Sequence, residues 1–283
     1  MTDFAAWIGR EQIGRDRLTS QHAFQWCSTF DLEWPGDKIM PQGIHFALCT
    51  PQARTDCLGD DGHPARDDSS DSFLPPFPMP RRMWASSKVQ FHAPIAIGAV
   101  IDRISRVVSV SEKSGGSGRL AFVDVEHVTK ANGTIAVIET QTLVYRDAAG
   151  PDAPLSPPPP GDGAFDPAGW EAIRTLTPDP RLLFRYSALT FNTHRIHYDA
   201  PYAEQVERYR GLVVHGPLTA SLLLQLAADK LGENRVRTFT FRGLSPAIAG
   251  EALHLVMRKG EAGYELAAFA EDGRQVTQAS ATT

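Results

Sequence analysis

The sequence lacks the features of disulfide-rich, membrane-spanning and secreted proteins. Its three cysteines, Cys27, Cys49 and Cys57, are odd in number and have no metal-ligand spacing. We therefore expect reduced thiols, as in a cytosolic protein. The longest apolar stretch, residues 212–228, is interrupted by His, Gly, Pro and Gln, and it is too short to cross a bilayer. The N-terminal residues mix acids and bases without an apolar segment, so we expect no secretion signal and a cytoplasmic location.

The charge balance excludes a further class of partner. The chain has 28 basic and 33 acidic residues, a net charge of -5, and no basic run that would neutralise a phosphate backbone. A nucleic-acid partner is therefore not expected. The Gly-x-Ser-x-Gly turn of many serine hydrolases is also missing from the sequence. With 42% hydrophobic and 22% charged residues, the composition is that of a globular protein, and it favours small-molecule chemistry.

A proline-rich segment divides the chain. Asp147 to Trp170 contains four consecutive prolines with scattered Gly and Asp, a composition that neither nucleates a helix nor pairs in a sheet. We predict a linker over residues 147–164 between an N-terminal domain, 1–146, and a C-terminal domain, 165–283. Two domains of about 130 residues fit the usual size range.

The two halves share a pattern of strands. A β-rich segment passes through Pro94-x-x-x-Gly98 in the first half and through Pro246-x-x-x-Gly250 in the second. Alternating apolar and polar residues follow each copy, as expected for antiparallel strands. Order and pattern therefore indicate a duplicated α+β unit rather than two unrelated domains.

The most informative single element is an apolar helix in the second half. Pro217 and Gly232 are helix start and stop signals around a nearly uninterrupted apolar run. A helix that is apolar all round must be wrapped, and an antiparallel sheet curling around it is one way to bury it. In the first half the equivalent segment at Gly43 is cut short by Pro51. Residues 59–80, acidic and then proline-rich, are expected to form an irregular surface excursion.

Three motifs carry a family resemblance. They are SALTFNTHRIHYD at Ser187–Asp199, VVHGPLTASLLL at residues 213–224 and PRRMWA at residues 80–85. Together they resemble the MaoC-like hydratases, closest to the double-hotdog hydroxyacyl-thioester dehydratases that include mesaconyl-C4-CoA and itaconyl-CoA hydratases. The resemblance implies a double hotdog fold, two antiparallel sheets each wrapped around a central helix. The N-terminal half has no Asn-x-x-x-x-His followed by His-Gly, so we predict that it has lost the site and instead widens the acyl pocket.

The same resemblance implies the reaction, the reversible addition of water to an α,β-unsaturated acyl-CoA, with a branched C5 dicarboxylic acyl group as one option. Coenzyme A would be part of the substrate, and no further cofactor is expected. We also expect a homodimer or a higher homo-oligomer.

The resemblance assigns three catalytic positions. His197 falls on the family's catalytic histidine, Gly216 on the glycine whose backbone N–H meets the thioester oxygen, and Asn192 on the position where most relatives have an aspartate. An amide side chain can orient water but has no titratable group near neutral pH. His197 is therefore the sole obvious base, and an ordinary histidine pKa predicts that kcat/KM rises around pH 6–7.

Further residues are candidates for substrate binding: His215, Arg195, Arg81, Arg82 and Trp84. A zinc site formed by His194 and His197 is not favoured, because no third ligand is evident nearby.

Two other functions use the same features. A hotdog thioesterase would release free coenzyme A, whereas a non-catalytic acyl-CoA-binding protein would bind the thioester and leave its conjugated absorbance unchanged.

Overall fold

The computed structural model describes residues 4–36, 38–115 and 118–283, and its elements occur as two similar series. The first series comprises β1 (Glu11–Arg17), α1 (Ser20–Thr29), the 3-10 turn η2 (Ile44–Ala47), β2 (Arg81–Phe91), β3 (Val100–Gly115), β4 (Gly118–Ala131) and β5 (Thr134–Arg146). The second comprises β6 (Ala172–Leu176), α2 (Pro180–Leu189), α4 (Gly216–Leu231), β7 (Thr238–Gly243), β8 (Leu253–Gly260), β9 (Gly263–Ala270) and β10 (Gln275–Thr282). Short elements lie outside this repeat: η1 (Phe4–Trp7), η3 (Thr55–Cys57), η4 (Arg195–His197) and α3 (Ala200–Gln205).

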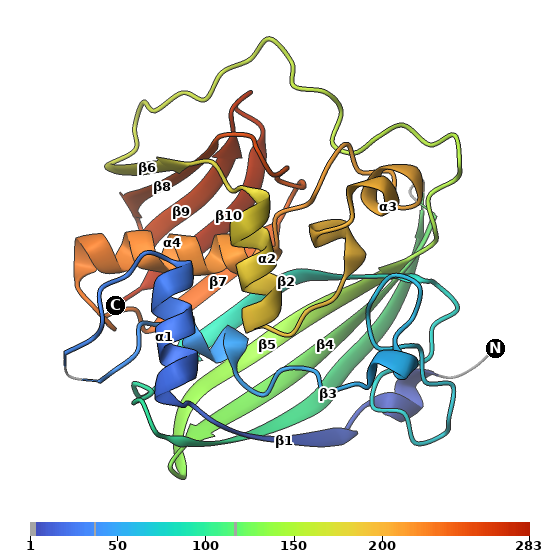
Figure 1. Cartoon of the computed structure of the whole chain (residues 1–283), viewed down its shortest axis with the longest axis horizontal. Coiled ribbons are helices and arrows are strands. Elements are labelled where there is room, and N and C mark those ends of the chain that lie inside the picture. The colour runs from blue at the N-terminus through green and yellow to red at the C-terminus, as the bar shows by residue number, and fades with distance from the viewer. Residues whose placement is uncertain (1–3, 37, 116–117) are drawn as a thin grey trace.

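The ten strands of the described residues form one antiparallel sheet. The strand order is β1-β3-β4-β5-β2-β7-β10-β9-β8-β6. Read outwards from the centre, β2, β5, β4, β3 and β1 on one side correspond to β7, β10, β9, β8 and β6 on the other. The two halves join where β2 pairs with β7, with Val89 opposite Phe239. Figure 1 shows the strongly curved sheet, with the helices gathered on one side of it. The sheets of the two hotdog units are therefore continuous with each other.

The turns that suggested a duplication occupy equivalent places. Gly98 and Gly250 have φ values of 92° and 88°, a left-handed conformation that glycine adopts without steric cost. Just before each glycine, the chain forms an isolated antiparallel bridge, Ile39 to Ala96 in one half and Val213 to Ile248 in the other. The repeated backbone geometry supports the interpretation of a duplicated unit.

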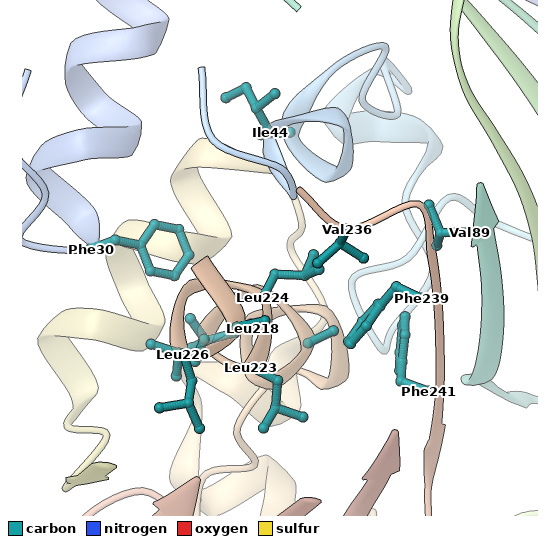
Figure 2. Close-up of a cluster of buried hydrophobic side chains, with 14 of the residues drawn as sticks. Phe30, Ile44, Val89, Leu218, Leu223, Leu224, Leu226, Val236, Phe239 and Phe241 are labelled. Carbon is teal, nitrogen blue, oxygen red and sulfur yellow. The ribbon is translucent and has the colours of Figure 1, made fainter. Parts of the chain in front are cut away.

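The apolar helix is the centre of the C-terminal half. As expected, α4 has a proline in its first turn and ends before Gly232, whose φ is 93°. Leu218 and Leu223 are fully buried, and Phe239 of β7 packs in the same cluster. Figure 2 shows the leucines of α4 between the aromatic rings of β7 and Phe30. A helix packed on every side has a fixed position, and so does its N-terminal end.

The N-terminal half is built differently around its core. Among the described residues it has only the single turn η2 in the place of α4, as the proline at position 51 predicted. Residues 59–80 form no helix or strand, but the expectation that this excursion is purely superficial is wrong. Phe77 and Met79 are buried against Val123, Val125 and neighbouring residues of β3–β5. These apolar side chains cover part of β3–β5 in a cluster separate from the one that contains η2 and α4.

The remaining features concern the linker and the helices. Residues 147–164 contain an isolated bridge at Ser156 but no helix or strand. The proposed domain limits stay a prediction. No helix in the described part of the chain is long and apolar enough to cross a membrane.

Candidate active site

His197 lies in η4 and is held by a main-chain contact. Its Nδ1 lies 2.7 Å from the carbonyl oxygen of Val213. Because a carbonyl can only accept, Nδ1 must carry the hydrogen, and Nε2 of the neutral ring keeps its lone pair. The residue is 7% exposed. This arrangement presents one basic nitrogen in a fixed orientation.

A second imidazole supports the first. The ring of His215 stacks on that of His197 with a centroid separation of 3.5 Å and an interplanar angle of 20°. Nε2 of His215 lies 2.9 Å from Oγ of Ser187, and His215 is 1% exposed. It occupies the N-cap position of α4 without a side-chain capping bond. So little free surface favours an orienting role for His215 over the direct substrate contact expected from the sequence.

Burial keeps both rings neutral. It lowers the pKa of His197 to about 4, although the Val213 hydrogen bond acts in the opposite direction and the charge of His63 adds to the decrease. Burial, together with His197 and His194, also holds the pKa of His215 well below its usual range. His197 is therefore already deprotonated at neutral pH, and the expected rise of kcat/KM around pH 6–7 does not agree with this environment.

Gly216 begins α4 directly after the stacked His215. It is exposed, and a Cβ added at this position would meet no atom within 4 Å. The first N–H groups of a helix have no partner within that helix, and Pro217 has no N–H of its own. The free amide and the His197 ring are thus brought to the same end of α4. A reacting thioester needs this pairing of a base with an N–H donor.

Asn192 precedes η4 and is half-buried. Its Oδ1 accepts a hydrogen bond from the backbone N–H of His194 at 3.0 Å. The side-chain oxygen is therefore already used to shape the loop, and the Nδ2 group remains as a donor.

The N-terminal half reaches this loop through residues that the sequence did not single out. The Thr193 hydroxyl donates to the Gly62 carbonyl at 2.5 Å, and the Arg195 N–H donates to the Asp61 carbonyl at 2.8 Å. Gly62 has a φ of 86°, and a Cβ there would lie 1.9 Å from the Thr193 oxygen. The contact brings His63 over His194, with ring centroids 4.0 Å apart. The only signal in the sequence was an isolated Asp-Gly-His within an irregular segment.

The arginines expected to bind substrate differ in their surroundings. Arg195 donates two hydrogen bonds to Asp199 and lies over the ring of Tyr202. These three residues border a surface hollow of about 530 Å³. Arg81 forms a buried ion pair with Glu207. Both guanidinium groups are therefore already paired with carboxylates.

Arg82 and Trp84 complete the predicted set. Arg82 is half-buried and near enough for its charge to act towards a lower pKa at both Tyr145 and His194. No carboxylate in residues 4–36, 38–115 and 118–283 forms an ion pair with it. Trp84 instead packs against Phe46, and its indole N–H donates to the Ser87 hydroxyl at 2.8 Å. Arg82 thus has the freer charge, and Trp84 belongs to the packing of the sheet.

One group of side chains has the composition of a metal site. Ligand atoms of Asp61, His63 and His194 lie within 4.8 Å of one another. Zinc ligands about 2 Å from the ion lie roughly 3.3 Å apart in a tetrahedral site. Nδ1 of His63 is already 2.9 Å from the Asp61 carboxylate, as in a hydrogen bond. The zinc pair considered from the sequence has another geometry, with the rings of His194 and His197 perpendicular and 5.5 Å apart.

Comparisons with known proteins agree with this geometry. A family model for hydroxyacyl-thioester dehydratase type 2 matches residues 43–249. The chain belongs to this family. It is 40% identical to the mesaconyl-C4-CoA hydratase of Chloroflexus aurantiacus, over 99% of this chain and 97% of that protein. The prediction of a hydratase or dehydratase acting on acyl thioesters is confirmed.

Solved structures support the fold. A MaoC-like dehydratase from Phytophthora capsici is 13% identical, with a TM-score of 0.69 over 100% of this chain and 99% of that chain. A Mycobacterium tuberculosis protein with a double hotdog fold is 15% identical, with a TM-score of 0.60 over 97% of this chain and 95% of that one. The predicted double hotdog is confirmed.

Proposed function

We propose that this family member catalyses the reversible hydration of a branched C5 dicarboxylic acyl-CoA such as mesaconyl-C4-CoA, without a further cofactor. The observation that carries the proposal is the convergence of the free Nε2 of His197 with the open N–H of Gly216 at one end of α4. The identity to a mesaconyl-C4-CoA hydratase supports the choice of acyl group.

The proposed chemistry follows from these positions. His197 takes a proton from a water molecule through Nε2 as the oxygen attacks Cβ, and the Nδ2 group of Asn192 holds that water. The Gly216 N–H stabilises the negative charge that develops on the thioester oxygen. Losing one donor of this kind typically costs about 100-fold in rate. His215 keeps the His197 ring in place through its stacked face.

The distal carboxylate of the substrate needs a cation, and Arg82 supplies it in this proposal. Arg82 is the candidate whose guanidinium is not already paired with an acid among the described residues. Arg195 is already ion-paired with Asp199 and borders the surface hollow, and we assign it to the phosphates of coenzyme A rather than to the distal carboxylate.

A panel of enoyl-CoA substrates with and without a distal carboxylate tests the proposal. We expect an 18 Da gain in mass, with the dicarboxylic substrates preferred, and we expect Arg82→Gln to reduce that preference. Release of free coenzyme A would instead indicate a thioesterase. Tight binding without any absorbance change would indicate a binding protein.

Two variants test the assigned roles. His197→Ala should lose kcat by about 100-fold or more, because one acid/base group contributes at least that factor. Asn192→Ala should lose less, since it orients water without exchanging a proton. Near wild-type turnover of a folded His197→Ala protein would refute the assignment.

Assembly and location complete the proposal. We expect a homodimer or a higher homo-oligomer, and exposed Phe24 and Phe184 on the adjacent helices α1 and α2 support a contact surface there. Light scattering after size exclusion measures the mass, and a monomer at micromolar concentration would contradict it. The three free cysteines are consistent with a cytoplasmic location.

A further inference from the structure

Hydration of a conjugated thioester moves two protons, one away from water and one to Cα. The base described above accounts for the first. Asn192 cannot account for the second, because its amide does not titrate near neutral pH. Its oxygen is also occupied by the His194 N–H. His197, once protonated, is itself able to return a proton, and a separate donor for Cα would have to come from elsewhere in the structure.

The N-terminal half places a hydrogen-bonded acid and imidazole at this site. Nδ1 of His63 lies 2.9 Å from one carboxylate oxygen of Asp61, and the other oxygen accepts the backbone N–H of His63 at 3.0 Å. Burial by itself would raise the pKa of Asp61, but the hydrogen bonds and charge of His63 outweigh it and lower the pKa to about 2. The carboxylate is therefore charged, and it orients the ring so that Nε2 points away from it.

The segment that carries Asp61 and His63 is hydrogen-bonded to the loop that contains His194 and His197. Both neighbours of His194 in the sequence bond to the backbone of residues 61 and 62. The side chains of His63 and Asp61 are 22% and 23% exposed, so they are sheltered but reachable. The His63 ring faces His194, which in turn is perpendicular to His197 at 5.5 Å.

His194 itself is poorly suited to donate a proton. Burial lowers its pKa to about 2, and the neighbouring His63 and His197 act in the same direction. The His194 imidazole forms no hydrogen bond in the described part of the chain, and its ring lies against the rings of His63 and His197. Of the imidazoles in this group, His63 is the one whose Nδ1 faces a carboxylate, which leaves its Nε2 directed away from Asp61.

We propose that the N-terminal half completes the active site by supplying His63, oriented by Asp61, as the second acid/base group. This inference rests on the proposed hydration. As water attacks Cβ and His197 takes its proton, the electron pair of the double bond moves to Cα and the thioester oxygen. The His63 Nε2–H then protonates Cα, leaving a neutral His63 and a protonated His197. Exchange with solvent returns both rings to their starting states, so that one water has been added.

The experiment compares variants of the full-length protein on one hydrated substrate. His63→Ala should lower kcat by about 100-fold, the usual contribution of one acid/base group, with a much smaller change in KM. His63→Gln, which keeps a donor for the carboxylate, should be equally slow because it cannot exchange a proton. Asp61→Asn should lose less. His92→Ala, which removes an exposed histidine in the turn after β2, is the matched control and should remain at wild-type rate.

Rescue separates chemistry from structure. Added imidazole should restore kcat of His63→Ala in proportion to its concentration, and it should leave His63→Gln slow because the glutamine side chain occupies the space of the ring. A merely structural role would give the opposite pattern, with His63→Gln active and imidazole without effect. Either of these two results overturns the proposal.

Two further outcomes are informative. If the wild-type protein and His92→Ala hydrate the substrate and His63→Ala matches them, only the inference on His63 fails. If the wild-type protein hydrates no enoyl-CoA, the proposed function fails and this inference with it.

Wild-type activity should also survive incubation with a chelator. Its loss, with recovery on adding zinc, would make the Asp61, His63 and His194 group a metal site instead.

Discussion

Lowering the pH tests the environment of His197 most directly. A histidine in water has a pKa of about 6.5. The buried ring of His197 has a pKa of about 4 because burial disfavours its charged form. The base should therefore stay neutral, and active, well below the pH at which an ordinary histidine takes up a proton.

The expected difference is large at pH 5. A base with a pKa of 4 is about 90% deprotonated there, whereas one with a pKa of 6.5 is only about 3% deprotonated. If kcat/KM follows the neutral fraction of the base, the two cases differ by about 30-fold at that pH. The acidic limb of the profile should have its midpoint near pH 4.

The assay follows the conjugated thioester absorbance at low substrate concentration between pH 4 and pH 8. Initial rates then report kcat/KM, which depends on the free enzyme. A substrate without a distal carboxylate removes one titrating group of the ligand. Returning each sample to pH 7.5 and repeating the assay checks that loss of rate at low pH is reversible and does not reflect unfolding.

Two results would refute the reasoning. A midpoint near pH 6.5 would mean that the ring of His197 is solvated rather than stacked and buried. An acidic limb that persists unchanged in His197→Ala, at whatever residual rate, would mean that another group titrates.

Three further predictions concern the scaffold. Gly62→Ala should reduce activity far more than Gly98→Ala. Both positions have positive φ, but only at Gly62 would the new Cβ clash with the Thr193 carbonyl. Equal kcat/KM values of the two variants would contradict this. Leu223→Ala should lower the free energy of unfolding by about 2–5 kcal/mol in urea titrations, because it opens a cavity beside α4, and a loss below about 1 kcal/mol would argue against tight packing there. Burial lowers the pKa of His45 to about 3, below its value in the unfolded chain. The contribution of this neutral residue to the free energy of unfolding should therefore be complete above about pH 6.5 and should be lost as the pH falls towards 3. An unfolding midpoint in urea that is the same at pH 7 and pH 4.5 would contradict the buried state of this residue.

The sequence by itself determined the elements that depend on local signals. Pro217 and Gly232 set the ends of α4, and the proline at position 51 limited its N-terminal counterpart to one turn. Apolar alternation identified the strands, because neighbouring side chains on a strand point to opposite faces of a sheet. The resemblance of the segment from Asn192 to His197, with the following His-Gly pair, then pointed to the His197 ring and the start of the helix as the candidate site.

The tertiary structure decided what depends on segments far apart in the chain. The low pKa of His197 arises from burial, to which the charge of the distant His63 adds, and no local pattern contains either cause. Asp61 and His63 lie more than 130 positions before the loop that they touch, in a segment without helix or strand. Only the packing of that segment over the N-terminal half of the sheet brings them to the site, because an irregular loop has no periodicity from which its course could be predicted.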